Sequence, residues 1–424
     1  MKLAVFTTRF PGKVSTFFAR DMRSLIDAGI EVDVFPIRRN DPSLWSYVPD
    51  ILDERILPRN RVHHIDSTAL LRSLGRAPME RALDFLRDTA AVGSSAARAG
   101  VPPLAKSLYV VPLAWAWAAH FGDKYDHVFS YWGHYPATCA CLAHRFAGRS
   151  IPFTFQLHAG ADLYFNKVFL RQKLLYADSI VTVCEFNQRY LQEHFGDIYE
   201  RFAHKIHINH MGVDLSEFAY APGGRDPRRV TGVGRFVSTK GYDYLIRAIA
   251  ELVRRGVDVQ LELVGDGEEG GRLRELAQQL DIMDRVTFRG WLNSDGVRLA
   301  MRQAAVFVHP SSGLGDAKPN VVEEAMAVGT PVIASHVSGI PELLDQGRCG
   351  ILVPPKDVQA LAAAIERLLA DAALRRTYAE DARRYAEDAL DLWRNGARLA
   401  EHLRSVERDY HESRTTDRRP AQVA

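Results

Sequence analysis

The sequence predicts an α/β protein made of two doubly wound parallel-sheet domains that face a cleft. Three features predict this fold: the length of the chain, a repeated strand–helix–strand pattern, and a change of composition near the middle. The chain has 424 residues, of which 47% are hydrophobic and 25% are charged. It is therefore globular and long enough for two domains, each with its own core.

The first half of the chain repeats one supersecondary unit. Residues 2–8 form an apolar strand, residues 15–29 carry apolar side chains at helical spacing before a glycine, and residues 30–37 form a strand again. A strand, a helix and a strand at this spacing predict a right-handed crossover in a parallel sheet. The pattern continues through "DHVFSYW", the helix "PATCACLAHRFAG", "IPFTFQLHAG", "SIVTVCEF" and "KIHINHMGV". We assign residues 1–218 to a first domain.

A linker follows at residues 219–229, where "AYAPGGRDPRR" collects glycine, proline and charge without periodic apolar positions. Residues 230–389 then alternate strands and helices again, and we assign them to a second domain. Its predicted strands are "RVTGVGRF", "VDVQLELVGDG", "RVTFRGWL", "AAVFVHP", "TPVIAS" and "GILVPP". A last helix at about 390–410 is expected to pack back onto the first domain. Residues 411–424 lack an apolar period and are expected to be disordered.

Charge, cysteines and the N-terminus limit the cellular context. The formal net charge of +2 is nearly neutral for this length, so we expect no nucleic-acid partner. The four cysteines show neither zinc-site spacing nor a disulfide framework, and reduced thiols are expected. The opening "MKLAVFTTRFPGK" has too short an apolar run for a signal peptide and is predicted to be a first strand. These features predict a cytoplasmic protein.

Residues 108–121, "LYVVPLAWAWAAHF", are the segment that best fits a membrane contact. They are too short to span a bilayer, which takes about 20 residues, and they contain a proline. Two interpretations stay open. Trp115, Trp117 and Phe121 could form an interfacial anchor, which would hold the protein peripherally at the inner face of the cell membrane. Alternatively, the segment is a buried aromatic helix packed on a sheet.

The segment "GVGRFVSTKG", residues 232–241, places glycines at a strand end and Arg235 and Lys240 around the start of the next helix. Backbone N–H groups at a helix start and two cations favour the binding of a diphosphate. The same glycines are common turn chemistry, so this segment alone leaves both interpretations open. Its spacing fits neither a Walker loop nor G-x-G-x-x-G, which disfavours ATPase and dehydrogenase functions, and the chain has no G-x-S-x-G elbow.

Seven motifs occur in order across nearly the whole chain: "HAGADL", "INHMGVDLSEF", "GRFVSTKG", "LVGDGEE", "RVTFRGWL", "EEAMAVGTPVIAS" and "GIPELL". Together they resemble the retaining glycosyltransferases of family four, which have the GT-B fold of two Rossmann-like domains. The resemblance is strongest in the second domain and weaker before residue 150. The opening "RFPGKVSTFFARDMRSLIDAGIEVDVFPI" is similar to the subgroup that builds exopolysaccharide or lipid-linked oligosaccharide.

The resemblance implies that the first domain binds a glycan or lipid-linked acceptor and that the second binds a UDP- or GDP-sugar as donor. Arg235 and Lys240 match the pair of cations that neutralises the donor diphosphate. No cofactor and no metal are therefore expected, and the chain has no Asp-X-Asp motif. In this family the leaving diphosphate takes the proton of the attacking hydroxyl, so the protein mainly positions substrates and stabilises charge.

Further roles follow from the resemblance residue by residue. His158 matches the histidine that contacts the donor sugar near the reacting carbon, although a histidine at a strand end is also a common structural residue. Glu324 matches the acid that binds the ribose hydroxyls, and its neighbour Glu323 is expected to be solvated or salt-bridged. Gly12 lies in the loop where backbone approaches the diphosphate and the acceptor. Trp291 is positioned like the base-binding turn but could equally be a core residue.

The loop that begins at Asp316 is expected to hold the sugar and the β-phosphate of the donor. The family usually has a glutamate eight residues before the acid that corresponds to Glu324. This chain has Asp316 at that position. This shorter acid favours a particular sugar or signals weakened catalysis. Lys318 stands where the family commonly has an apolar residue, and it adds a cation near the phosphates or points to solvent. The predicted catalytic residues are His158, Asp316, Arg235 and Lys240, and the predicted donor-binding residues are Gly12, Gly234, Arg235, Lys240, Trp291, Ala317, Lys318, Pro319, Asn320 and Glu324.

The sequence is consistent with three functions. The favoured one is a metal-independent sugar transferase that uses a nucleotide-diphosphate sugar. The second is a sugar-nucleotide epimerase of the same two-domain fold, which would form its product with no acceptor present. The third is a weakly active or non-catalytic subunit, which would bind the donor tightly without releasing nucleotide.

Overall fold

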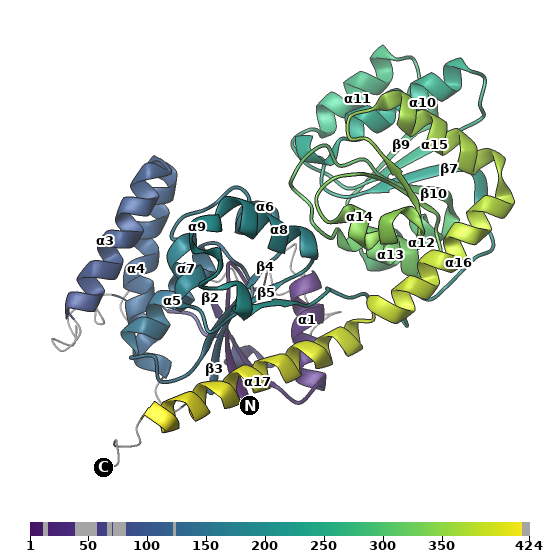
Figure 1. The fold of residues 1–424 in the computed structure, drawn as a ribbon. Coiled ribbons are helices and arrows are strands. Elements are labelled where there is room, and N and C mark those ends of the chain that lie inside the picture. The colour runs from purple at the N-terminus through teal and green to yellow at the C-terminus, as the bar shows by residue number, and fades with distance from the viewer. Residues whose placement is uncertain (12–15, 39–56, 66–69, 71–81, 122–123, 418–424) are drawn as a thin grey trace, which may run out of the picture. The chain divides into compact units, whose positions relative to one another are not determined.

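The computed structural model describes residues 1–11, 16–38, 57–65, 70, 82–121 and 124–417. The chain divides into two compact units, which are both drawn in Figure 1. Unit 1 comprises Met1–Val183, Asn187–Asn209 and Trp393–Ala424. Unit 2 comprises Cys184–Phe186 and His210–Leu392.

Unit 1 is built on a six-stranded parallel sheet with the order β2-β1-β3-β4-β5-β6. Its strands are β1 (Lys2–Thr7), β2 (Glu31–Pro36), β3 (His127–Ser130), β4 (Phe153–Leu157), β5 (Ser179–Thr182) and β6 (Ile206–Ile208). Around them lie α1 (Thr16–Asp27), α3 (Ala82–Arg98), α4 (Val101–Phe121), α5 (Tyr135–Phe146), α6 (Gly160–Leu163), α7 (Leu170–Tyr176), α8 (Glu185–His194), α9 (Gly196–Tyr199) and α17 (Leu392–Asp417), with the short helices η2 (Arg59–Arg61) and η5 (Ala203–Lys205). The six strands predicted from the sequence are confirmed.

Unit 2 has a second six-stranded parallel sheet, with the order β12-β11-β10-β7-β8-β9. Its strands are β7 (Asp226–Val233), β8 (Gln260–Val264), β9 (Val286–Gly290), β10 (Ala304–His309), β11 (Val332–Ser335) and β12 (Ile351–Val353). The helices are α10 (Tyr242–Arg254), α11 (Gly270–Gln279), α12 (Ser294–Gln303), α13 (Asn320–Val328), α14 (Ile340–Leu343), α15 (Val358–Ala370) and α16 (Ala372–Ala389), with η6 (Ser238–Lys240), η7 (Met283–Arg285) and η8 (Asp345–Gly347). These strands were also predicted, and the fold class of two doubly wound parallel sheets is confirmed.

The strand order of each sheet locates its ligand-binding edge. In unit 1 the chain leaves β1 toward β2 and later resumes on the other side of β1 with β3. In unit 2 it likewise leaves β7 toward β8 and resumes on the other side of β7 with β10. In open parallel sheets, ligands bind at the carboxyl ends of the strands where the order reverses. A ligand is therefore expected at the loops after β1 and β3 in unit 1 and at those after β7 and β10 in unit 2.

Residues 210–218 belong to unit 2, although the sequence-based boundary places them in the first domain. The Val213 N–H donates to the Leu390 carbonyl at 2.8 Å, and the Leu392 N–H donates to the Val213 carbonyl at 3.2 Å. Gly212 lies so close that an added Cβ would be 2.5 Å from the Cα of Leu392. Because these contacts join backbone atoms, they produce no periodic pattern of apolar residues, and the sequence does not reveal them. The boundary lies before this segment.

The predicted linker at 219–229 is fixed to unit 2 by Arg225. Its guanidinium donates hydrogen bonds of 2.8–3.4 Å to backbone carbonyls and to one hydroxyl, and these acceptors are Ala221, Met301, Arg302, Ala304, Val328, Gly329 and Thr330. Apart from the Ala221 carbonyl, which belongs to the linker, the carbonyls come from the ends of α12 and α13 or the residue that follows each helix, where helices leave their last acceptors unsatisfied. The planar fork of an arginine can serve many acceptors at once.

We expect Arg225→Ala to destabilise unit 2 by about 2 kcal/mol, because buried carbonyls lose a charged donor. Hydrogen–deuterium exchange of the β7 and β10 amides should then be about 30-fold faster. Arg225→Lys should recover little, since an ammonium cannot reproduce the fork. Arg228→Ala is the matched control, because Arg228 makes exposed ion pairs with Asp226 and Asp258, which contribute little. Equal exchange rates in the Arg225 and Arg228 variants would contradict this role.

The last helix, α17, lies in unit 1. Leu399, Ala400 and Leu403 are buried in the core that contains α1 and β1, and the Arg404 guanidinium donates to the Ala28 carbonyl at 2.6 Å. The helix runs on to Asp417, so the disorder expected for the tail is wrong over residues 411–417. One reason is that Arg414 covers the Tyr410 ring at 4.8 Å, one helical turn away. The remaining part of that prediction, 418–424, lies outside the described residues.

The aromatic side chains of α4 belong to the core. Trp115, Trp117 and Phe121 are only 7%, 1% and 1% exposed. The Trp117 ring meets Phe35 edge-on at 4.8 Å, and the Trp115 ring packs on Phe146 at 5.3 Å. Rings buried in the core cannot enter a lipid interface, so the predicted membrane anchor at these residues is wrong and the buried aromatic helix is correct.

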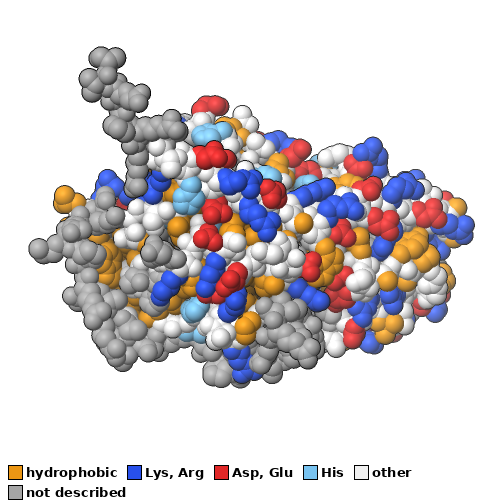
Figure 2. All heavy atoms as spheres, turned by 90° about the horizontal axis from the view of Figure 1, so that it is seen from below, with side chains coloured by type: hydrophobic (Ala, Val, Ile, Leu, Met, Phe, Trp, Pro, Cys, Tyr) orange, Lys and Arg blue, Asp and Glu red, His pale blue; other side chains and the backbone are white. Residues whose placement is uncertain are grey.

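The surface of the described residues adds two observations. None of their helices combines the length and the apolar character that crossing a membrane requires. Among the described residues on the face drawn in Figure 2, blue basic and red acidic side chains are interspersed.

Candidate functional site

In unit 2 the loops after β7 and β10 are bonded to each other. The Ser312 N–H donates to the Thr239 carbonyl at 2.9 Å, and the Ser312 hydroxyl donates to the Ser238 carbonyl at 3.1 Å. Gly241 has a φ of 67°, and a Cβ added there would lie 2.1 Å from the Pro310 carbonyl oxygen. Only glycine fits this close approach of two loops. The loop that carries Lys240 is thereby held against the loop that carries Asp316.

Lys240 and Asp316 form an ion pair at the centre of this site. The Lys240 ammonium donates to both carboxylate oxygens of Asp316, at 2.8 and 2.7 Å. The Ser311 hydroxyl donates to Oδ2 of Asp316 at 2.6 Å, and Nε2 of His309 lies 3.0 Å from the same oxygen. Asp316 is therefore engaged by three side chains, two of which the sequence analysis did not single out.

The surroundings keep Asp316 ionised. Burial alone raises the pKa of a carboxyl, but the Lys240 ammonium and the hydrogen bond from His309 outweigh it and hold the pKa of Asp316 well below its usual range. Burial also lowers the pKa of His309. The side chains of Lys240 and Asp316 are 14% and 17% exposed, so this network borders solvent while most of it is buried.

The start of α10 adds backbone donors beside Lys240. The cap residue of this helix is Gly241, and no side chain caps its first turn. Uncapped N–H groups and the helix dipole favour an anion at this place. Arg235 is exposed in the same loop, and Gly234 ahead of it has a positive φ of 153°. The arrangement combines two cations with a helix start, as the sequence predicts for a diphosphate.

Lys318 and Glu323 form a buried ion pair. Their side chains are 1% and 0% exposed, and the ammonium lies 3.7 Å from a carboxylate oxygen of Glu323. Burial lowers the pKa of Lys318. The prediction that Lys318 points to solvent is therefore wrong, and of the two expectations for Glu323 the salt bridge is correct. A contact between Lys318 and the donor phosphates stays a prediction.

The other predicted donor-binding residues of unit 2 lie along the start of α13 or near β9. Ala317 is 1% exposed, Pro319 is the cap residue of α13, and Asn320 is its first residue. Glu324 follows one turn later and is 9% exposed. Trp291 directly follows β9 and is 57% exposed, so the alternative that it is a core residue is wrong. Gly12, the predicted donor-binding residue of the first domain, lies outside the described residues.

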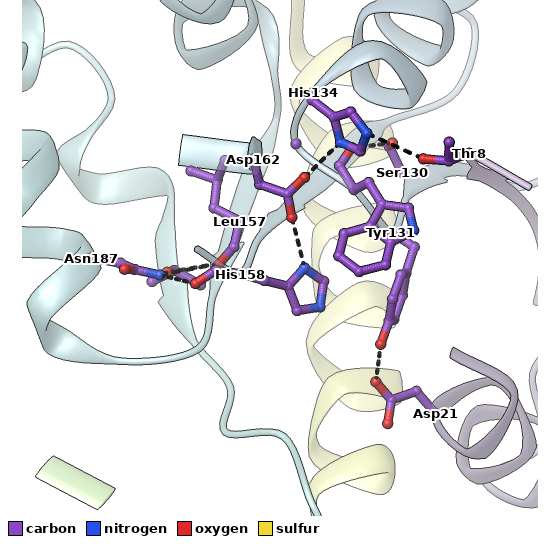
Figure 3. Close-up of polar contacts among 12 residues, drawn as sticks. Thr8, Asp21, Ser130, Tyr131, His134, Leu157, His158, Asp162 and Asn187 are labelled. Atoms are coloured by element: carbon purple, nitrogen blue, oxygen red, sulfur yellow. Dashed lines mark hydrogen bonds and ion pairs between the residues drawn. The ribbon is translucent and has the colours of Figure 1, made fainter. Parts of the chain in front are cut away.

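In unit 1 His158 belongs to a network at the carboxyl ends of β1, β3 and β4 (Figure 3). Asp162, on α6, binds Nδ1 of His134 through Oδ1 at 2.6 Å and Nδ1 of His158 through Oδ2 at 3.2 Å. Nε2 of His134 lies 3.2 Å from the Thr8 hydroxyl, which comes from the loop after β1. Although burial alone would raise it, the two histidines hold the pKa of Asp162 below its usual range. The site predicted from His158 alone therefore contains two imidazoles and a carboxylate.

Aromatic rings and a second carboxylate border His158. Its ring lies 4.8 Å from the rings of Tyr131 and Trp132. The Tyr131 hydroxyl donates to Oδ2 of Asp21 at 2.6 Å, and burial raises the pKa of Asp21. Apolar rings beside hydroxyl-binding carboxylates are typical of sites that bind sugars, which have both apolar and hydroxyl faces. Sequence reasoning missed these residues, because Tyr131 and Trp132 stand inside the predicted strand "DHVFSYW" and Asp21 stands inside a predicted helix.

A buried lysine fixes the loop that follows β3. Lys173 is 0% exposed, and its ammonium donates to the Gly133 carbonyl at 2.6 Å, the His134 carbonyl at 3.1 Å and the Thr138 hydroxyl at 3.2 Å. Burial lowers its pKa to about 7. Sequence reasoning missed this residue, because its position in a short helix far along the chain gives no sign of the loop it supports.

The described residues contain no group of three or more His, Cys, Asp or Glu side chains arranged to hold a metal ion. The four cysteines are buried, and burial raises the pKa of Cys141 to about 12. A thiol with so high a pKa is a poor nucleophile at neutral pH.

Comparison with known proteins supports a sugar-transferring function. Residues 227–371 match the family described as "Glycosyl transferases group 1". The chain is 28% identical over 386 residues to "Putative colanic acid biosynthesis glycosyltransferase WcaL" of Salmonella typhimurium, which covers 86% of this chain and 89% of that protein.

Solved structures support the fold. The chain matches a sucrose-phosphate synthase of Thermosynechococcus elongatus with a TM-score of 0.69 and 21% identity, over 96% of this chain and 99% of the other. It matches Anabaena Alr3699/HepE, solved in complex with UDP-glucose, with a TM-score of 0.67 and 19% identity, over 96% and 100% of the two chains. The chain is therefore a glycosyltransferase with the GT-B fold, whose glycosyl transferases group 1 domain lies in residues 227–371.

Proposed function

We propose that the enzyme transfers a sugar, with retention at the anomeric carbon, from a nucleotide-diphosphate sugar to a glycan or lipid-linked acceptor. The observation that carries this proposal is the network of Lys240, Asp316, Ser311 and His309 beside the start of α10. It offers a fixed cation and backbone donors to an anion, and a carboxylate to hydroxyl groups. A diphosphate joined to a sugar carries both kinds of group.

In this proposal unit 2 binds the donor. Lys240 and Arg235 contact the diphosphate and stabilise the charge that develops when the bond to the sugar breaks. Glu324 accepts hydrogen bonds from the ribose hydroxyls, and Trp291 contacts the base. Anabaena HepE, whose fold is similar, was solved with UDP-glucose bound, which supports a UDP-sugar as the first donor to test.

Unit 1 contributes His158 and binds the acceptor. His158 contacts a hydroxyl of the donor sugar, and the departing diphosphate takes the proton of the attacking acceptor hydroxyl. The protein then needs no strong nucleophile, because orientation and charge stabilisation supply the rate enhancement. That the two units face a common cleft and close over the substrates stays a prediction.

The biological role that we propose is polysaccharide biosynthesis in the cytoplasm. Support comes from WcaL, whose name refers to colanic acid biosynthesis and which aligns over most of both chains. The acceptor would then be a growing glycan, free or attached to a lipid.

A panel of nucleotide-sugars tests the donor. The cognate donor should raise the melting temperature, because a ligand at about 100 times its Kd adds about 2.7 kcal/mol to the stability of the state that binds it. The enzyme should then release nucleoside diphosphate, and NMR of the product should show the anomeric configuration of the donor. An inverted product would contradict retention. Stabilisation by no UDP- or GDP-sugar would contradict the donor assignment.

We expect turnover to persist in excess EDTA, because Lys240, Arg235 and the start of α10 neutralise the diphosphate in place of a metal. The measurement is nucleotide release from the best donor with EDTA and after adding back Mg²⁺ or Mn²⁺. Loss of turnover in EDTA that either metal restores would show that the reaction requires a divalent cation.

A further inference from the structure

Asp162 binds two histidines, each through the Nδ1 atom of its own ring. Oδ1 lies 2.6 Å from Nδ1 of His134, and Oδ2 lies 3.2 Å from Nδ1 of His158. Asp162 is 2% exposed, and its lowered pKa keeps it ionised. An ionised carboxylate can only accept hydrogen bonds. Both Nδ1 atoms must therefore carry a proton, and in a neutral ring the other nitrogen, Nε2, then bears a lone pair.

His134 is consistent with this assignment. Its Nε2 atom lies 3.2 Å from the Thr8 hydroxyl, which can donate a hydrogen bond to a lone pair. The backbone around His134 is fixed as well, since Lys173 donates to its carbonyl at 3.1 Å and to that of Gly133 at 2.6 Å. Each group around this ring then finds a partner of the opposite kind.

His158 differs in one respect. Its Nε2 atom is shielded from solvent and has no hydrogen-bond partner among the described residues. A buried acceptor without a donor is unfavourable, by about 1–3 kcal/mol in typical cases. Such an atom in a polar site indicates a ligand that supplies the missing donor. Figure 3 shows Nε2 on the side of the ring away from Asp162.

The orientation of His158 is fixed by its neighbours. The Asn187 amide donates to the His158 carbonyl at 2.7 Å and to the Leu157 carbonyl at 3.3 Å. The rings of Tyr131 and Trp132 lie on the imidazole at 4.8 Å. With backbone and ring both held, the partner at Nδ1 decides which nitrogen of His158 carries the proton.

We propose that Asp162 is a positioning residue that keeps the proton of His158 on Nδ1 and thereby leaves Nε2 as a hydrogen-bond acceptor for a hydroxyl of the donor sugar. The identity of that hydroxyl rests on the proposed function. The placement of the proton does not, because it follows from the contacts within unit 1. Asp162 itself touches no substrate in this proposal.

The variant Asp162→Asn tests the proton directly. An asparagine has one oxygen, so one of the two histidines must face its NH₂ group and give up the proton on Nδ1. Because His134 has the shorter contact, we expect it to keep the oxygen and His158 to move its proton to Nε2. ¹⁵N NMR of the histidine rings distinguishes these tautomers, and the loss of signals in His158→Gln identifies the ring.

The expected spectrum of the unaltered protein shows His158 protonated on Nδ1, and that of Asp162→Asn shows it protonated on Nε2. Asp162→Glu, which keeps the carboxylate, should retain the first pattern. Asp178→Asn is the matched control, because the half-buried Asp178 carboxylate accepts a hydrogen bond from the Phe153 N–H at 2.8 Å. It should leave His158 unchanged. Protonation on Nε2 in the unaltered protein would overturn the proposal even if Asp162→Asn failed to fold.

Turnover supplies the second readout. Asp162→Asn should lower kcat for the best nucleotide-sugar about tenfold, because a donor then meets the sugar hydroxyl where an acceptor is needed. Its affinity for the free nucleoside diphosphate should be unchanged, and Asp162→Glu should recover most of the turnover. Unchanged kcat despite the moved proton would overturn the contact with the sugar. A moved proton in a protein that turns over no nucleotide-sugar would confirm the role of Asp162 in placing the proton and contradict the proposed function instead.

Discussion

Lys240→Ala is expected to lower turnover of the best nucleotide-sugar by about a thousandfold while the fold survives. Lys240 directly precedes Gly241, the cap residue of α10. Its ammonium is fixed by two hydrogen bonds to Asp316, so it is already in place when charge develops on the leaving diphosphate. Removing one fixed donor of this kind typically costs about 10²- to 10³-fold. Because Lys240→Ala removes a full positive charge from the leaving group's surroundings, we expect the loss of turnover to lie at the upper end of this range.

The measurement is nucleoside diphosphate release under saturating donor, with circular dichroism to verify the fold. Arg235→Ala should lower turnover less, because Arg235 is exposed in the same loop. Arg247→Ala is the control: this arginine is exposed on α10 itself, so the change removes a charge from the same helix away from its start. A Lys240→Ala enzyme with the turnover of the control would show that the diphosphate binds elsewhere.

Asp316→Asn is expected to lower turnover about a hundredfold and also to weaken binding of the free nucleoside diphosphate. The resemblance to known enzymes predicts only a contact between this acid and the donor sugar. The structure adds that Asp316 holds Lys240, so an amide, which offers the ammonium one acceptor in place of two, leaves the cation less well placed. Asp316→Glu keeps the negative charge and should lose less turnover than Asp316→Asn.

A double-mutant cycle separates the two roles of Asp316. If Asp316 acts through Lys240, the double variant Lys240→Ala/Asp316→Asn should be no slower than Lys240→Ala alone. If Asp316 mainly touches the sugar, the two losses should multiply. Nucleoside diphosphate affinity, measured by calorimetry on the three variants, provides the check. Unchanged affinity in Asp316→Asn would contradict a role in holding Lys240.

Much of the fold could be predicted from the sequence because parallel strands are buried on both faces and appear as short apolar runs between helices. The pairing of Lys240 with Asp316 could not, since the residues are 76 positions apart. They meet because β7 and β10 are neighbours in the sheet, and strand order is set by the packing of the whole unit. The motifs predicted that both residues bind the sugar donor, but they did not show that the two side chains bind each other.

The network in unit 1 was only partly predictable for a related reason. His158 could be named from its motif, and Asp162 lies four residues later, but its two imidazole contacts depend on where the loop after β3 brings His134. That loop is supported by Lys173, which is 40 positions from Gly133 in the chain. The error in α4 has a different origin: aromatic residues suit a lipid interface and a protein core equally well, and only packing distinguishes them.

The path of the chain through the two units determines the order in which they can finish folding during synthesis. Unit 2 is nearly continuous, whereas unit 1 is completed by α17, which supplies Leu399, Ala400 and Leu403 to its core. Domains fold as they leave the ribosome when all their parts are present. The first half of the protein therefore emerges first but cannot finish folding until the last helix has been released. Its six strands are already made, but the core around α1 and β1 lacks α17 throughout the synthesis of unit 2, and in that interval a chaperone that shields apolar surface would act.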